Sequence, residues 1–449
     1  MRRSKAEEHN KLKWWQLSLF GVGCTIGTGF FLGSSLAIKM TGPSILIDFV
    51  IAAIGTYFVF DALSKMTALE PLEGGFRSYA KKAFGRWAGF SSGWTYWCSE
   101  VLIAGSQMTA LAIFSRFWFP KVPLWLFAAG YAILGLAVIV IGVGVLNKLE
   151  NILAVLKIAA IFMFVMIALL AIFGVIDGSR AIEYPNSRKD FFPNGMTGLW
   201  SAVIFAFYAF GGIEILGLMA TKLQDPKEAP KAGRVMLFLL VFIYVLSIGL
   251  AVMLVSWHQF NEKESPFVIA LDAYHLSFVP HVFNGALIIA GFSTMTASLY
   301  GVTSILVTLS EEGDAPHKFS KKGKLKIPLS TLLLTMLGIA ASVVTALLMP
   351  GHIYEYITTA AGLMLLYNWI FILASSGKIL KPGIGGKMKY SLGAVLILIA
   401  VSGTLFHRSS RPGFFISLAF IGIIGAVTVL MNLKWKKNEK KMWKPWPTG

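Results

Sequence analysis

The stretch from Gly21 to Phe31 holds the residues whose types and spacing most directly suggest chemistry. It reads GVGCTIGTGFF, with four glycines inside a long apolar run. Each glycine costs a helix interior about 1 kcal/mol relative to alanine, so the run is a poor continuous helix. A helix that breaks here frees backbone N–H groups at one new end and carbonyl groups at the other, and both can bind a charged small molecule. The alternative is close helix packing, because Gly23 and Gly27 also form a G-x-x-x-G pair.

A second interruption lies at residues 205–214, which read FAFYAFGGIE. It combines the pair Gly211 and Gly212 with a carboxylate, Glu214, in the middle of an apolar run. Glycine-interrupted helices at matching places in two halves of a chain mark the central site of a transporter. An amino acid fits such a pair of breaks, because its carboxylate matches the N–H groups and its ammonium the carbonyls. The two stretches together therefore favour an amino-acid site over simple packing.

Three ionisable residues inside apolar runs are further candidates. Lys157 lies about eight residues from the end of its run, about 12 Å deep at 1.5 Å per residue. A buried lysine loses its proton readily, so it is a candidate for proton coupling, and the alternative is a lysine that reaches back to the membrane surface. Glu100 and Glu214 are candidates by the same rule. For Glu100, a place in the pocket and a role in helix packing remain equally open.

The composition of the chain indicates which kind of secondary structure positions these residues. The chain has 449 residues, of which 56% are hydrophobic and only 14% charged. Runs of about 20 apolar residues cross the hydrocarbon core of a membrane, and there they must be helical. We expect an all-α membrane protein of about twelve spans, at 15–38, 43–66, 88–119, 122–145, 149–176, 197–221, 232–256, 281–310, 328–349, 353–376, 389–406 and 413–433.

The distribution of basic residues predicts the orientation. With both termini in the cytoplasm, inner segments hold thirty of the 40 Lys and Arg residues and outer loops hold nine. Positive charge gathers on the cytoplasmic side, so we expect a multi-pass protein of the cytoplasmic membrane with a cytoplasmic tail at 1–14 and a basic one at 434–449. The inner basic loops and the tail then face anionic lipids, and the formal charge of +18 does not indicate nucleic acid. The loop 257–280 is outer, and Ser265–Tyr274 is predicted to be a short helix, either a lid or an ordered loop.

Several classes of function have no support in the sequence. Cys24 and Cys98 both lie in apolar runs, which argues against a disulfide framework. The sequence has no His/Cys metal spacing, no G-x-S-x-G and no Walker A motif. We therefore expect no enzyme and no bound cofactor.

The motifs resemble those of a known family. The run 21–31 is similar to the G-x-G-x-x-I-G-[ST]-G-x-F signature of permeases in the amino acid–polyamine–organocation superfamily, and 205–214 with Gln224-Asp225-Pro226 is similar to that family's sixth span and following loop. The segment 74–80, the region 265–267 and the region 299–316 resemble further family motifs. The resemblance covers roughly residues 15–430. It implies a five-plus-five inverted repeat of the leucine-transporter type (repeats at 15–176 and 197–376) with two additional helices at 389–433.

The resemblance also implies roles for individual residues. The backbone at Thr25, Ile26, Gly27, Thr28 and Gly29 is expected to bind the substrate carboxylate. The carbonyls of Tyr208, Ala209 and Phe210 are expected to bind its amino group, while Gly211 and Gly212 permit the break. Phe207, Tyr208 and Phe210 are candidate gating rings, or else core or lipid-facing aromatics. Glu214 is implied to have a structural or gating role, and Lys157 is implied to stand where sodium-coupled relatives bind a cation, so protons rather than sodium are the expected driving ion.

The sequence departs from the family pattern in two places. Ala220-Thr221-Lys222 replaces the acidic residues usual before the Asp-Pro, and Thr296-Ala297 and Ser304 replace an Asn-Ser and an Arg of span 8. These changes put the salt bridges of an inner gate in doubt.

We expect an amino-acid:proton symporter that imports its substrate by alternating access. Predicted aromatic and aliphatic pocket walls favour a neutral, apolar amino acid, while Glu100 keeps cationic amino acids open. The main alternative is an exchanger of two amino acids or of an amino acid and its amine. A channel would lack the paired breaks around a closed site.

Overall fold

The architecture comes from a computed structural model. It describes residues 11–72, 74–141, 143–176, 184–219, 223–272, 274, 276, 278–321, 327–348 and 353–442.

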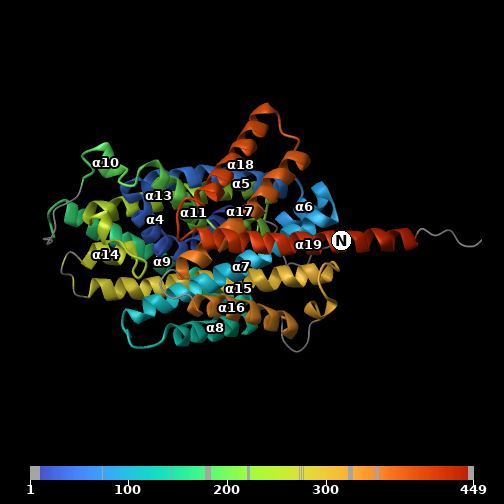
Figure 1. Cartoon of the computed structure of the whole chain (residues 1–449), viewed down its shortest axis with the longest axis horizontal. Helices are drawn as coiled ribbons and strands as arrows, with labels where there is room; N and C mark the ends of the chain where they lie inside the picture. Colours follow the sequence, from blue (N-terminus) through green and yellow to red (C-terminus); the bar gives the residue numbers. More distant parts are fainter. Residues whose placement is uncertain are drawn as a thin grey trace, which may run out of the picture.

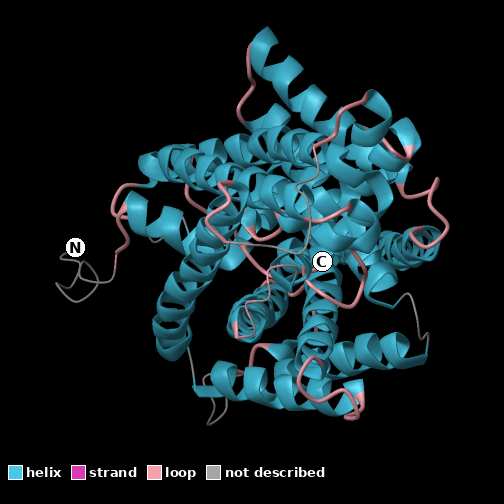
Figure 2. Cartoon of the chain, turned by 90° about the vertical axis from the view of Figure 1, so that its left-hand side faces the viewer, coloured by secondary structure: helices cyan, strands magenta, loops and turns pink. Residues whose placement is uncertain are grey.

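The described residues form helices joined by short loops, and they contain no strand beyond a single bridge between Leu12 and Leu223 (Figure 2). The α-helices are α2 (Trp14–Thr25), α3 (Thr28–Phe31), α4 (Gly33–Thr41), α5 (Ile45–Leu69), α6 (Phe76–Phe84), α7 (Arg86–Arg116), α8 (Leu124–Ile141), α9 (Val143–Ile172), α10 (Arg188–Phe191), α11 (Gly195–Ala209), α12 (Ile213–Met219), α13 (Ala229–Leu254), α14 (Pro266–Asp272), α15 (Val279–Glu311), α16 (Leu329–Leu348), α17 (Ile353–Ile379), α18 (Ile384–Gly403) and α19 (Arg411–Met442). Short 3₁₀ turns lie at Gly42–Ser44, Pro226–Glu228, Trp257–Gln259 and His317–Phe319.

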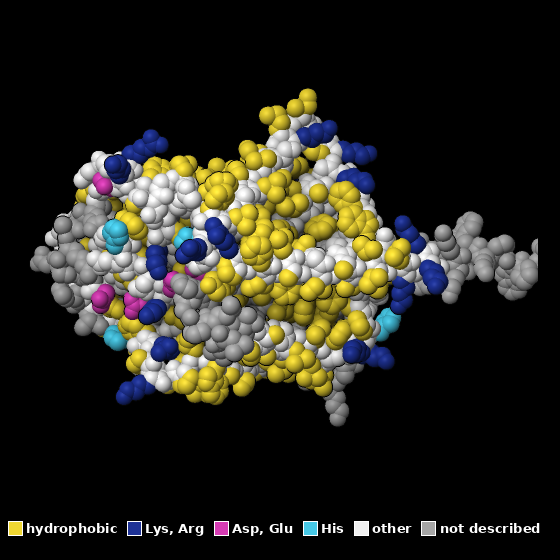
Figure 3. Space-filling view, viewed as in Figure 1, with side chains coloured by type: hydrophobic (Ala, Val, Ile, Leu, Met, Phe, Trp, Pro, Cys, Tyr) yellow, Lys and Arg dark blue, Asp and Glu magenta, His cyan; other side chains and the backbone are white. Residues whose placement is uncertain are grey.

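The helices are those of a membrane protein. Among the described residues, nine helices are long and apolar enough to cross a bilayer. Their apolar side chains face outward as well as inward, and hydrophobic side chains cover the centre and right of the face in Figure 3. Lipid, rather than a protein core, accounts for such an exposed apolar surface.

Burial separates central helices from peripheral ones. In the most apolar window of α7, 94% of the residues are buried, against 17% in α8 and in α19. Helix α7 packs along α15 and against α17, while α8 and α16 cover one side of this pair and α18 lies on the opposite side of the molecule (Figure 1). Polar residues on α7 and α15 therefore lie in the interior of the protein.

The observed helices follow the predicted spans along the chain, and nine of the described helices, against the twelve spans predicted, are long and apolar enough to cross a bilayer. The first predicted span is divided into α2, α3 and α4, and the sixth into α11 and α12, which confirms that both glycine stretches interrupt helices. The predicted lid segment contains the short helix α14. The last span was predicted to end near residue 433, but α19 continues to Met442, and Trp435 in this extension packs against Phe90 with ring centroids 5.6 Å apart.

Candidate functional site at two broken helices

The first break lies between α2 and α3. The N–H of Ile26 still donates to the carbonyl of Val22 at 3.0 Å, but Gly27 is extended, with φ −152° and ψ −157°. The chain then begins a new helix at Thr28. The first N–H groups of a helix have no carbonyl one turn earlier to bond with, so the N–H groups of Thr28 and Gly29 are available to a ligand.

The second break lies between α11 and α12. Helix α11 ends at Ala209, and Gly212 has a φ of +110°, a conformation that residues with a Cβ rarely adopt. The Glu214 carboxylate closes this turn by accepting hydrogen bonds from the N–H of Gly212 at 3.0 Å and from the indole N–H of Trp369. A carboxylate at a helix start is favoured by the helix dipole. Glu214 thus holds the second break in shape.

The two breaks meet at one buried pocket of about 30 Å³. Of the residues predicted to bind substrate, those at the pocket are Thr25, Gly27, Thr28, Gly29, Glu100, Tyr208, Gly211 and Gly212. The sequence interpretation missed the other lining residues, which are Cys24, Ile103, Gln107, Thr294, Ala297 and Ser298.

Helix periodicity contained a signal for most of the missed residues. Glu100, Ile103 and Gln107 are three and four residues apart, so they share one face of α7. Thr294, Ala297 and Ser298 share a face of α15 in the same way. Once Glu100 is placed in the pocket, Ile103 and Gln107 follow from spacing alone.

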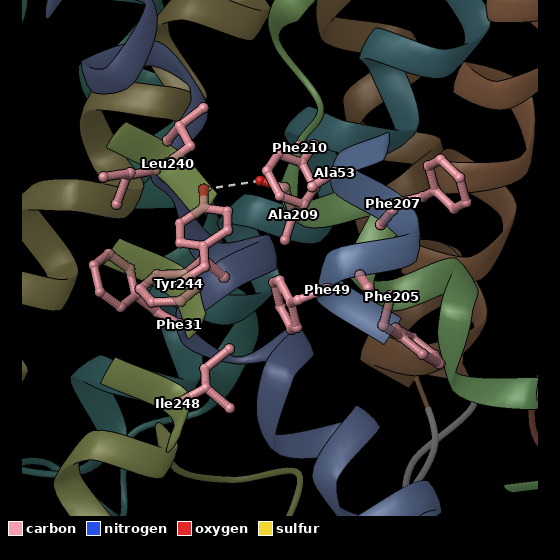
Figure 4. Packing of buried hydrophobic residues seen from close by; sticks show 14 of the residues in the cluster. Phe31, Phe49, Ala53, Phe205, Phe207, Ala209, Phe210, Leu240, Tyr244 and Ile248 are labelled. Atoms are coloured by element: carbon pink, nitrogen blue, oxygen red, sulfur yellow. Dashed lines mark hydrogen bonds between the residues drawn. The ribbon is translucent and has the colours of Figure 1, made fainter. Parts of the chain in front are cut away.

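Four predicted binding residues do not line this pocket, and each has a structural reason. Ile26 is fully buried, and its N–H caps α2. The Ala209 carbonyl accepts a hydrogen bond from the Tyr244 hydroxyl at 2.9 Å (Figure 4). The rings of Phe207 and Phe210 pack elsewhere, against Trp369 and Tyr244 respectively, at centroid distances of 6.1 Å and 5.2 Å.

The pocket wall is more polar than the expected aromatic and aliphatic wall. Its larger apolar side chains are Ile103 and the ring of Tyr208, whose hydroxyl pairs with Ser106 at 2.6 Å. Most other lining residues are glycines or polar residues. Four buried lining oxygens have no hydrogen-bond partner among the described residues: Thr25 Oγ1, Thr28 Oγ1, Glu100 Oε2 and Gln107 Oε1. Buried polar atoms are rarely left unpaired, so these oxygens are candidate ligand contacts.

Lys157 lies beside the first break. Its side chain is only 1% exposed, and its ammonium donates to the carbonyl of Gly23 at 2.5 Å. The last carbonyls of a helix lack intrahelical partners and carry the negative end of the dipole, so the charge of Lys157 is placed at the C-terminal end of α2. Lys157 does not reach to the surface. Gly23 also packs tightly on α9, since a Cβ there would lie 2.8 Å from Ala154 Cβ, so the glycine serves packing as well as the break.

A partly open cavity of about 610 Å³ lies at the end of the bundle that carries Lys39 and Arg116. Tyr354 lines this cavity, and its hydroxyl donates to the carbonyl of Thr28 at 2.9 Å. Because Thr28 lines the central pocket, this hydrogen bond stands between the cavity and the pocket. The sequence did not point to Tyr354, which lies in the first turn of α17 and belongs to no motif.

The opposite end of the bundle is held by ion pairs. Arg77 of α6 is fully buried and binds Glu312 at 2.6 Å and Asp314 at 2.5 Å. Lys81 also binds Glu312, at 2.5 Å, and Arg86 binds Asp314, at 2.8 Å. Burial opposes the ionisation of Glu312, but hydrogen bonds to Lys81 and Arg77 hold its pKa below the usual range.

The departures from the family pattern in span 8 put ion pairs at this end in doubt, but the structure contains them. Residues of the Gly-Gly-Phe-Arg segment and of the loop after α15 supply the charges, instead of Ser304 and its neighbours. The other departure, Ala220-Thr221-Lys222, lies outside the described residues.

Comparisons with known proteins agree with this arrangement. The family model described as Amino acid permease matches residues 16–442. The chain is 55% identical over 431 residues to the uncharacterized transporter YcgH of Bacillus subtilis (strain 168), covering 96% of this chain and 97% of the relative. It is 28% identical over 421 residues to the aromatic amino acid transport protein AroP of Escherichia coli (strain K12), covering 92% of each. It is also 30% identical over 360 residues to the uncharacterized amino acid permease YvbW of B. subtilis (strain 168), covering 79% of this chain and 80% of that one. These relatives are transporters rather than enzymes, and the chain belongs to the amino acid permease family.

Proposed function

We propose that this permease imports an amino acid by proton symport and alternating access across the cytoplasmic membrane. The observation that carries the proposal is the meeting of two helix breaks at one buried pocket, with Lys157 bound to the first break. The N–H groups of Thr28 and Gly29 bind the substrate carboxylate, and carbonyls at the end of α11, near Tyr208, bind its ammonium. Gly211 and Gly212 permit this geometry.

Lys157 is the proposed proton-coupling group. Its ammonium donates to the carbonyl of Gly23 at the end of α2. This position, at the negative end of the helix dipole, would otherwise suit a metal cation. Loss of the proton weakens this contact and so links the charge of Lys157 to the shape of the first break. This arrangement favours protons over sodium as the driving ion.

The two ends of the bundle support alternating access. The 610 Å³ cavity approaches the pocket from the Lys39 end, whereas ion pairs close the Arg77 end. The asymmetry of Lys and Arg along the sequence supports a cytoplasmic Arg77 end with both termini on that side, and in this orientation the cavity faces outward. In this orientation the basic end of α19 lies near the anionic inner leaflet.

Two kinds of substrate side chain are candidates, one neutral and apolar and the other cationic. AroP is named as an aromatic amino acid transporter, and this agrees with the neutral, apolar substrate that the sequence favours. The position of Glu100 in the pocket wall favours a cationic amino acid instead.

The test is uptake of labelled amino acids by the purified protein in proteoliposomes, with competition by all twenty amino acids at two pH values. We expect saturable uptake that rises when the outside is acidic. Saturable uptake of none of the twenty would contradict the proposal, and strong stimulation by internal amino acid without need of a pH gradient would show an exchanger.

A further inference from the structure

We propose that Glu100 binds a cationic amino group on the side chain of the substrate, so that the permease selects diamino acids such as lysine and ornithine over neutral amino acids of the same length. This inference rests on the proposed function, because it assumes that the pocket at the two breaks holds an amino acid.

The first observation is the position of Glu100 on α7. The two helix breaks provide backbone groups for the carboxylate and the ammonium that every amino acid shares. Helix α7 provides a different kind of wall, with Glu100, Ile103 and Gln107 on one face. This wall and the one on α15 present side-chain atoms rather than freed backbone. Of the two, only the α7 wall carries an ionisable side chain among the lining residues, so we assign to it the part of the substrate that differs between amino acids.

The second observation is that two acceptor oxygens on this face of α7 are unpaired. Glu100 is 2% exposed and Gln107 is 7% exposed, and Glu100 Oε2 and Gln107 Oε1 both lack a hydrogen-bond partner among the described residues. An unpaired buried acceptor costs about 1–3 kcal/mol. A substrate side chain that donates hydrogen bonds satisfies these oxygens, whereas an apolar one leaves them unpaired.

The third observation is the charge of the pocket. The lining holds the carboxyl of Glu100 and, over the described residues, no Lys, Arg or His. The Tyr96 and Ser298 hydroxyls are hydrogen-bonding neighbours of the Glu100 carboxyl, but neither carries a charge that could balance it. A buried carboxylate needs a counter-charge, and an ammonium on the substrate supplies one inside the pocket.

The neighbouring carboxylate of Glu214, unlike that of Glu100, has hydrogen-bond partners for both of its oxygens. Glu214 interacts with Glu100 electrostatically, but its own oxygens are bound by the Gly212 N–H and the Trp369 indole. It also does not line the pocket. Repulsion between the Glu214 and Glu100 carboxylates further favours a cationic substrate group at Glu100, because that group attracts both carboxylates.

A neutral substrate would leave Glu100 with a different task. The carboxyl would then have to take up a proton to be buried, and Glu100→Gln, which has the shape of the protonated acid, would preserve the preference among substrates. The two possibilities therefore predict opposite results for one substitution.

The experiment measures uptake into proteoliposomes of lysine and of norleucine, which is lysine without the side-chain amine. We expect the wild type to prefer lysine by about 10- to 100-fold, the range for one hydrogen bond to a charged group. In Glu100→Gln the ratio of lysine to norleucine uptake should fall to near one. The matched control is Glu355→Gln, which alters a second buried carboxylate, bound by Ser410 and outside the pocket lining, and it should keep the wild-type ratio.

Competition in the wild type keeps the proposal testable if Glu100→Gln does not fold. Ornithine and 2,4-diaminobutyrate should then inhibit lysine uptake strongly, and norleucine, leucine and glutamine weakly. Equal inhibition by lysine and norleucine, or an unchanged ratio in Glu100→Gln, would overturn the inference while leaving amino-acid transport intact. If the wild type takes up no amino acid at all, it is the proposed function that fails.

Discussion

At the scale of single residues, Lys157 is the side chain that we propose couples the proton to the substrate site. Its depth in an apolar run could be read from the sequence, because run length and rise per residue fix it. Its partner could not, since Gly23 is 134 positions away and offers only a backbone carbonyl. Sequence therefore predicts which lysine is buried, while the fold decides which break it contacts.

Replacement of Lys157 should uncouple transport from the pH gradient. We expect Lys157→Ala to reduce pH-driven uptake at least tenfold, because no group is left to exchange a proton at the end of α2. Lys157→Arg keeps the charge but does not release a proton, so it should fail in the same way. Uptake driven by an imposed pH gradient in proteoliposomes measures both. An exposed lysine, Lys82, provides the control in Lys82→Ala, and normal pH-driven uptake by Lys157→Ala would refute the coupling role.

At the scale of helices, the breaks were predictable and most of their surroundings were not. Glycine clustering is local information, and it located the interruptions inside the stretches 21–31 and 205–214, where the helices break. The orientation of a helix face is set by its neighbours, so the sequence left Phe207 and Phe210 as either gating rings or core aromatics, and in the structure they pack against Trp369 and Tyr244. Arg77 and Asp314 lie 237 positions apart, and one sequence alone gives no sign that they pair.

We expect the ion pairs around Arg77 to keep that end of the bundle closed. Arg77→Ala leaves the buried Asp314 with Arg86 as its remaining ion-pair partner among the described residues, and breaking a buried pair costs about 3–5 kcal/mol. We expect this variant to open more often toward the Arg77 side. Cys24 lines the pocket, so a membrane-impermeant thiol reagent applied from that side, with Cys98 replaced by Ser, reports the opening.

The expected result is labelling of Cys24 several-fold faster in Arg77→Ala than in the parent protein. Lys82→Ala is a matched control, because Lys82 and its partner Glu70 are about half exposed and such pairs contribute about 0–1 kcal/mol. Equal labelling rates in Arg77→Ala and the control would show that the network does not close this end.

At the scale of the whole molecule, stability should depend on acid through Glu312. Its pKa is lowered from 4.5 when the network is intact, so the folded state binds fewer protons than the unfolded one. The stabilisation is then complete above about pH 4.5 and is lost as the pH falls through the lowered pKa. We expect Glu312→Gln to melt at a lower temperature than the wild type at pH 7, and the difference to shrink below about pH 4.5. Thermal unfolding of the detergent-solubilised protein at several pH values measures this, and a difference that is the same at all pH values would contradict it.

The central claim is that an amino acid binds where the two broken helices meet, and Cys24 allows a direct measurement there. In the Cys98→Ser protein, the rate at which a small thiol reagent modifies Cys24 is followed with and without amino acids. We predict that each amino acid that is transported slows the modification, at concentrations close to those that half-saturate its uptake, and that amino acids that are not transported do not. Unchanged modification of Cys24 in the presence of a saturating transported amino acid would contradict the claim.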